Sequence, residues 1–111
     1  MLSFEYNVDM YKIFLGLNDK ESHVQEISTE NAMGFVSHYL ANHFAGATVY
    51  NGIGVYKHEN GDVVRENSLI VELVYVSEEE VEQAVSDLRY ELNQESVMIV
   101  KLKSAVQFYE G

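Results

Sequence analysis

Apolar and polar side chains alternate along four stretches of the chain, a spacing that is typical of β-strands. In the first stretch Tyr11, Ile13 and Leu15 are separated by Lys12 and Phe14. Successive side chains of a strand point to opposite sides, so this alternation presents one apolar face. The predicted strands are residues 10–17, 48–57, 63–76 and 96–102, and the last could extend to residue 109.

Two further stretches have the three- and four-residue spacing of amphipathic helices. The first covers residues 29–43, and either Ser28 or Thr29 could cap its N-terminus. The second follows Ser77-Glu78-Glu79-Glu80, a capping box in which the serine and the third glutamate satisfy each other's backbone amides. The apolar stripes are Met33, Val36, Leu40 and Phe44 in the first helix, and Val81, Val85, Leu88 and Leu92 in the second.

The order of these elements predicts the fold. Asn60-Gly61, a strong hairpin signal, joins the second strand to the third, so the order is βαββαβ. Two right-handed crossovers in one antiparallel sheet give an α+β ferredoxin-like sandwich with strand order 4-1-3-2 and both helices on one face. We predict a single domain over residues 1–111, with an ordered core over residues 10–109.

One face of this sheet has no helix to cover it. The more uniformly apolar set is assigned to the helices: Tyr11, Ile13, Leu15, Val49, Ile53, Val55, Leu69, Val71, Leu73, Met98, Val100 and Leu102. The opposite, open face then carries the apolar residues Phe14, Ile70, Val74 and Ile99. A monomer rarely exposes an apolar patch beyond a few hundred Å². We therefore predict a homodimer that buries this face.

The open face is also expected to carry charged and aromatic residues, namely Lys12, Tyr50, Tyr56, Glu72 and Lys101. Charges in an apolar setting are costly unless they are paired. One interpretation is an ion-pair cluster that fixes the register of the dimer. The other is a site for a small anionic ligand, which the lysines would bind and the tyrosines would stack upon.

The chain is strongly acidic, with eighteen acids against seven bases and a formal net charge of −11. Direct binding of nucleic acid is disfavoured, because it needs a basic surface. The second predicted helix carries many of the acids: Glu78, Glu79, Glu82, Asp87 and Glu91. They form a solvated face in one interpretation. In the other they bind a basic protein partner by imitating phosphates.

Cysteine is absent, so disulfide and thiolate chemistry are excluded, and the sequence suggests no metal site or cofactor. His38 and His43 are five residues apart on the first predicted helix, whereas a shared metal face needs a spacing of three or four. The acidic first residues do not resemble a signal peptide, and no apolar run approaches the ~20 residues that span a bilayer. A cytoplasmic protein without membrane contact is expected.

Several motifs together resemble the DUF3574 family, small bacterial domains without an assigned activity. The matching pieces are YKIFLGL at residues 11–17, GATVYNGIGVYKHENGDVVRENS at residues 46–68, the apolar strand at residues 69–76, and Gln94-Glu95-Ser96-Val97. The resemblance covers about 100 residues in the same order. It implies a ferredoxin-like fold and brings no catalytic residues with it.

Two polar pairs within these motifs are candidates for a functional role, Arg65-Glu66 and Gln94-Glu95. Their other interpretation is local. Arg65 would pair with an acid across the hairpin, and Glu95 would cap the turn before the last strand.

Three functions remain open from the sequence. The first is a non-catalytic, dimeric binding module for a small anionic ligand or a protein partner. The second is an acidic phage or mobile-element inhibitor that mimics nucleic acid to block a host defence enzyme of the anti-CRISPR or anti-restriction type. The third is a cofactor-free enzyme of the dimeric α+β barrel type, which uses a His, Tyr or Asp between the sheet and the helices.

Overall fold

The computed structural model describes residues 1–110 and places six elements in the predicted order. They are β1 (Glu5–Gly16), α1 (Thr29–His43), β2 (Thr48–Lys57), β3 (Val63–Val74), α2 (Glu78–Glu91) and β4 (Met98–Val106). The strands form one antiparallel sheet in the order β2-β3-β1-β4, the same order as 4-1-3-2. The predicted ferredoxin-like fold is confirmed.

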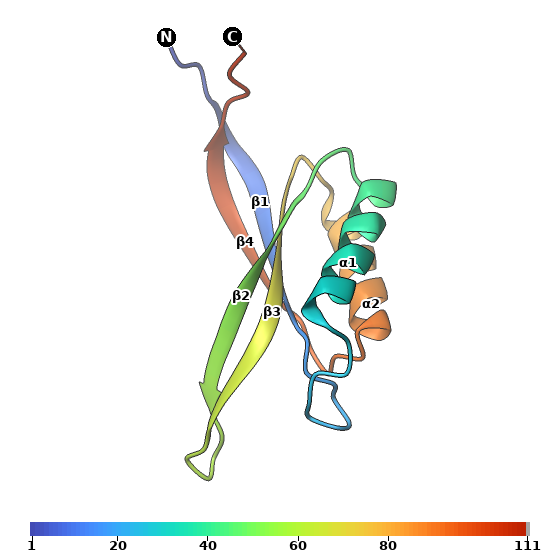
Figure 1. Cartoon of the computed structure of the whole chain (residues 1–111). Coiled ribbons are helices and arrows are strands. Elements are labelled where there is room, and N and C mark those ends of the chain that lie inside the picture. Colours follow the sequence, from blue (N-terminus) through green and yellow to red (C-terminus); the bar gives the residue numbers. More distant parts are fainter. Residues whose placement is uncertain (111) are drawn as a thin grey trace.

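The two helices lie side by side on one face of the sheet (Figure 1). The β2–β3 hairpin projects beyond the helices at one end, and the paired ends of β1 and β4 project at the other, where both chain termini lie (Figure 1). Ile53 and Val55 therefore remain 66% and 63% exposed, although they share a face with the core residue Val71. Only the middle of the sheet is covered.

Short-range signals set the ends of the helices. The Ser28 hydroxyl accepts a hydrogen bond from the Asn31 amide, as expected for the residue that caps α1. At α2 the Ser77 hydroxyl accepts from the Glu80 amide at 3.1 Å, and the Ser77 amide donates to the Glu80 carboxylate at 2.9 Å. The predicted capping box is confirmed.

The core lies between the helices and the central strands β1 and β3. Tyr11, Ile13 and Leu15 pair in register with Leu73, Val71 and Leu69, and all six are buried. The helices cover them with Ala32, Val36, Leu40, Val81, Leu88 and Leu92. The predicted phase of β1 and β3 is confirmed.

The predicted phase of β4 is wrong. Tyr11 and Ile13 pair with Lys101 and Ile99, so those two side chains lie on the helix-facing side. Met98, Val100 and Leu102 lie on the open face instead. β4 is an edge strand with no fully buried residue, so both of its faces are moderately apolar and only its register with β1 decides between them.

β1 also starts at Glu5, five residues before the predicted start. Its early residues do alternate, since Tyr6 and Val8 stand between Glu5, Asn7 and Asp9. They pair with β4 from Glu5 with Val106 to Asp9 with Lys103, with a register shift between Glu5 and Val8. The predicted start was therefore too late.

Candidate functional site

Part of the predicted polar cluster forms on the open face. The Lys12 amine lies 3.6 Å from a Glu72 carboxylate oxygen, and the Tyr50 hydroxyl donates to the same oxygen at 2.6 Å. That hydrogen bond raises the pKa of Tyr50, because the nearby carboxylate disfavours a phenolate. Lys12, Tyr50 and Glu72 therefore satisfy one another.

Lys101 does not join this cluster, and its predicted place on the open face is wrong. It lies on the other side of the sheet, 3.1 Å from Glu78 of α2 and 3.8 Å from Asp9. Its amine is also 5.8 Å from the centre of the Tyr11 ring. The bond to Glu78 and the charge of Asp9 raise the pKa of Lys101. An anionic ligand on the open face would meet one lysine there, already paired.

The remaining candidates on the open face are divided. Phe14, Ile70 and Val74 lie there as expected, since they belong to the β1–β3 pairs Phe14 with Ile70 and Met10 with Val74. Ile99 lies on the helix-facing side, so its assignment to the open face is wrong for the same reason as that of Lys101.

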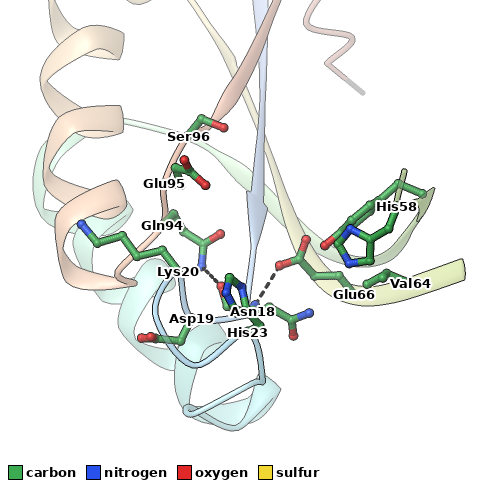
Figure 2. Close-up of a pocket in the computed structure, with 11 residues that line it drawn as sticks. Asn18, Asp19, Lys20, His23, His58, Val64, Glu66, Gln94, Glu95 and Ser96 are labelled. Carbon is green, nitrogen blue, oxygen red and sulfur yellow. Dashed lines mark hydrogen bonds between the residues drawn. The ribbon is translucent and has the colours of Figure 1, made fainter. Parts of the chain in front are cut away.

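Tyr56 is far along β2 from the Lys12 cluster and lines a different site. This is a cavity of about 260 Å³ where β1 ends, which the sequence did not predict as a site. Figure 2 shows the residues around it, which come from the loop after β1, the β2–β3 hairpin and the segment before β4. They are Asn18, Asp19, Lys20, His23, Tyr56, His58, Val64, Glu66, Gln94, Glu95 and Ser96.

Glu66 of β3 is held at this cavity by the backbone of Asn18. One carboxylate oxygen of Glu66 accepts a hydrogen bond from the Asn18 amide at 2.8 Å. The carboxylate packs over Gly16, where an added Cβ would lie 2.6 Å from its carbon and both its oxygens. Glycine at position 16 is therefore the residue that lets Glu66 take this position.

Gln94 reaches the same backbone from the other edge of β1. Its side-chain amide group donates to the carbonyl of Asn18 at 2.7 Å and to that of Leu92 at 3.2 Å. These bonds orient the side chain, because only the NH₂ end can donate to two carbonyls. Asn18 thus binds Glu66 through its N–H and Gln94 through its C=O, as the dashed lines in Figure 2 show.

The loop after β1 is fixed to the end of α2. The Asp19 carboxylate accepts a hydrogen bond from the Asn93 side chain at 2.7 Å, and from the amides of Glu21 and Ser22. These bonds hold the pKa of Asp19 below its usual range. The Lys20 amide in turn donates to the Asn93 carbonyl at 3.0 Å.

The cavity suits a cation with an aromatic part. Three acidic residues line it, Asp19, Glu66 and Glu95, against the single lysine Lys20. The Asp19 carboxylate is turned away from Glu66 and is bound by Asn93 and by its own loop (Figure 2). The rings of Tyr56 and His58 meet edge to face at its rim, with centroids 5.6 Å apart. A planar ligand group could pack against these rings while a positive group faces the acids.

The sequence marked Glu66 and Gln94 as candidates because they lie in motifs that resemble the family. It suggested only local partners for their neighbours Arg65 and Glu95. It missed Asn18, Asp19, Lys20, His23 and His58 entirely. One usable signal was present: Gly16 ends an otherwise alternating strand two residues before Asn18. Such a glycine often marks a close approach by another group.

The acids of α2 are not equally available. Glu78 pairs with Lys101, and Asp87 accepts hydrogen bonds from Tyr39 and Gln83. Burial and the bond to Asp87 raise the pKa of Tyr39. Glu79, Glu82 and Glu91 are exposed.

Across residues 1–110, no group of three His, Asp or Glu side chains is arranged to hold a metal ion. Neither helix in that range has the length and apolar character needed to cross a membrane.

Comparisons with known proteins bear on the family and the fold. The model of DUF3574, a protein family of unknown function, matches residues 10–108. No curated protein matches the chain. Among solved structures, a phage SAM lyase (SAM is S-adenosylmethionine) in complex with S-methyl-5′-thioadenosine is 22% identical, with a TM-score of 0.62. The match covers 99% of this chain and 98% of that one.

CutA from Synechococcus elongatus is 14% identical, with a TM-score of 0.61 over 94% of this chain and 85% of that one. CutA1 from Oryza sativa is 13% identical, with a TM-score of 0.55 over 94% of this chain and 85% of that one. At these identities the likeness establishes the shared fold.

Proposed function

The chain belongs to the DUF3574 family, whose function is unknown, and we propose that it binds S-adenosylmethionine in the Glu66 cavity and cleaves it to S-methyl-5′-thioadenosine. This is a cofactor-free enzyme, the third of the functions left open by the sequence. The site differs from the expected one, because it lies at the end of β1 rather than between the sheet and the helices.

The observation that carries the proposal is the position of Glu66. Its carboxylate is fixed by the Asn18 amide in a cavity that two more acidic residues line. S-adenosylmethionine offers a matching set of groups, since it carries a sulfonium, an ammonium and an adenine ring. The phage SAM lyase supports the ligand class, because that protein has the same fold and was solved with a thioadenosine bound. An anionic ligand would face the same three acids and is disfavoured.

The chemistry places few demands on the protein. When the bond between sulfur and the γ-carbon breaks, its electron pair goes to sulfur and gives a neutral thioether. The carbon fragment then makes up its electron deficit in one of two ways: it bonds its own carboxylate and closes a lactone, or the neighbouring carbon gives a proton to water and a C=C bond forms. Both routes balance without an oxidant or reductant. The enzyme contributes mainly by holding the substrate in a reactive conformation.

The test is to incubate the purified protein with S-adenosylmethionine and follow S-methyl-5′-thioadenosine by liquid chromatography and mass spectrometry. We expect product with the wild type, and a rate at least about tenfold lower with Glu66→Gln, because a charge-assisted contact is lost. Glu79→Gln, the same change on the exposed surface of α2, serves as the control and should keep the rate. Absence of both binding and product in the wild type overturns the proposal.

We also propose that the open face packs against a second copy of the chain. Phe14 and Val74 lie half-buried on that face, and Met98 and Leu102 of β4, 58% and 41% exposed, extend them into an apolar strip beside the Lys12–Glu72 pair, which carries no net charge. Ile70, also predicted there, is already buried within the chain. Elsewhere a chain of net charge −11 would repel its own copy, so this neutral strip is the surface best suited to self-association. The Lys12–Glu72 pair would then fix the register, as in the structural interpretation of the sequence.

The inhibitor hypothesis stays a prediction. Because Glu78 and Asp87 are already bound within the chain, the surface offered to a basic partner reduces to Glu79, Glu82 and Glu91. No feature of α2 beyond its charge favours this function over the cavity.

A further inference from the structure

The side-chain oxygen of Gln94 has no protein partner, although the residue is only 6% exposed. Both recorded hydrogen bonds of the side chain use its NH₂ group, and none of residues 1–110 donates to the oxygen. The oxygen faces the side of the cavity on which Glu66 lies (Figure 2). Among the described residues the fully buried side-chain atoms without a partner do not include this oxygen, so it is open to the cavity and free to accept a hydrogen bond from a ligand there.

Glu66 presents a second unused acceptor to the same space. One of its oxygens accepts from the Asn18 amide, and no residue of the described chain donates to the other. Glu66 is held by the N–H of Asn18 and Gln94 by the C=O of the same residue. Their acceptors are therefore fixed relative to each other.

Two acceptors, one of them anionic, favour a ligand group with several donors and a positive charge. A primary ammonium has three N–H donors and no acceptor, so it can bind both oxygens at once. The amino group of adenine has two N–H donors, but it carries no charge, and the ring nitrogens on either side of it are acceptors that would face the two oxygens. The adenine is better placed at the Tyr56–His58 rim, where a planar ring can pack against the aromatic side chains.

The sulfonium is a poor partner for Glu66 for a different reason. Cleavage removes the positive charge of the sulfur, so a carboxylate beside it would stabilise the substrate more than the transition state. The ammonium keeps its charge throughout the reaction. A contact between Glu66 and the ammonium would therefore position the substrate without slowing the step that breaks the bond.

We propose that the Gln94 oxygen and the unused Glu66 oxygen together bind the α-ammonium of S-adenosylmethionine, so that the cavity selects its ligand by the amino-acid end. This inference rests on the proposed function. It assigns Gln94 as a specificity-determining residue and the Asn18 backbone as the group that positions it.

The first experiment changes the ligand and leaves the protein intact. Calorimetry would compare the wild-type affinities for S-adenosylmethionine, for its analogue without the amino group, and for S-methyl-5′-thioadenosine, which lacks the whole amino-acid part. We expect the analogue without the amino group to bind at least about tenfold more weakly than S-adenosylmethionine. Equal affinity for these two ligands overturns the inference while leaving the proposed function in place. Binding of neither S-adenosylmethionine nor S-methyl-5′-thioadenosine removes the proposed function itself.

The second experiment changes Gln94 to Met, which keeps the length of the side chain and removes its amide. Affinity for S-adenosylmethionine should fall at least about tenfold, while affinity for S-methyl-5′-thioadenosine should change by less than about threefold. An equal loss for both ligands would mean that Gln94 only supports the fold, and the inference would be wrong. If the variant does not fold, Glu66→Gln gives the same comparison, because its carboxylate is the other half of the proposed contact.

Discussion

The chain has two polar clusters on neighbouring parts of one sheet, and they are built differently. In the Lys12–Tyr50–Glu72 cluster side chains bind side chains, and a single Glu72 oxygen takes both contacts. In the cluster at the end of β1, Glu66 and Gln94 bind the backbone of Asn18 and keep one acceptor each unused.

We infer from this difference that the Lys12 cluster has a structural role and that the cluster at the end of β1 binds a ligand. In the first cluster Lys12 already pairs with Glu72, so a charged ligand group would have to replace that ion pair. No lysine or arginine of residues 1–110 pairs with Glu66. A cluster fixed by the backbone, with acceptors left over, is preorganised and pays little to bind. The predictions below test this contrast, from the largest expected effect to the smallest.

The largest effect is expected from Gly16→Ala. The new methyl group would lie 2.6 Å from the Glu66 carboxylate and displace it, breaking the bond to Asn18. Because only the end of a flexible side chain must move, the protein should stay folded, while the rate of S-adenosylmethionine cleavage falls on the order of a hundredfold. Thermal melts and the product assay measure the two effects.

The matched control is Gly34→Ala in α1, where an added Cβ meets nothing within 4 Å. It should keep the full rate and slightly raise the stability of the helix. A Gly16→Ala protein that cleaves at the wild-type rate would show that the position of Glu66 does not matter.

Phe14→Asp on the open face is expected to lower the mass of the particle in solution from that of a dimer to that of a single chain. A carboxylate placed in the proposed interface would be desolvated without a partner, so the copies should separate. Light scattering after size exclusion reports the mass. Ile53→Asp, on the helix-facing side of the projecting hairpin, is the control and should leave the mass unchanged. If Phe14→Asp also leaves it unchanged, the open face is not the contact between copies.

The smallest effect is expected from Glu72→Gln. The amide can still accept the Tyr50 hydrogen bond, and only the pairing with Lys12 is lost, so the free energy of unfolding should fall by about 1 kcal/mol. Urea denaturation measures this change, and the cleavage rate should not respond. A clear loss of cleavage would place the substrate on the Lys12 cluster, and the contrast between the two clusters would fail.

The sequence alone determined the features that depend on neighbours along the chain. The element order, the capping box at Ser77 and the buried phase of β1 and β3 follow from periodicity and from contacts a few residues apart. In the central strands the two faces differ in polarity, so the pattern was enough to assign Tyr11, Ile13 and Leu15 to the face that the helices cover.

Only the tertiary structure decided what depends on distant pairings. β4 is an edge strand whose faces are similar in polarity, so its register with β1, and not its pattern, placed Lys101 and Ile99 on the helix-facing side. The candidate site depends on such pairings even more. Glu66 lies on β3 and Gln94 in the segment between α2 and β4, and they meet because both bind the backbone of Asn18. A backbone N–H and C=O are the same for every residue except proline, so no side-chain pattern could reveal that they join these two residues.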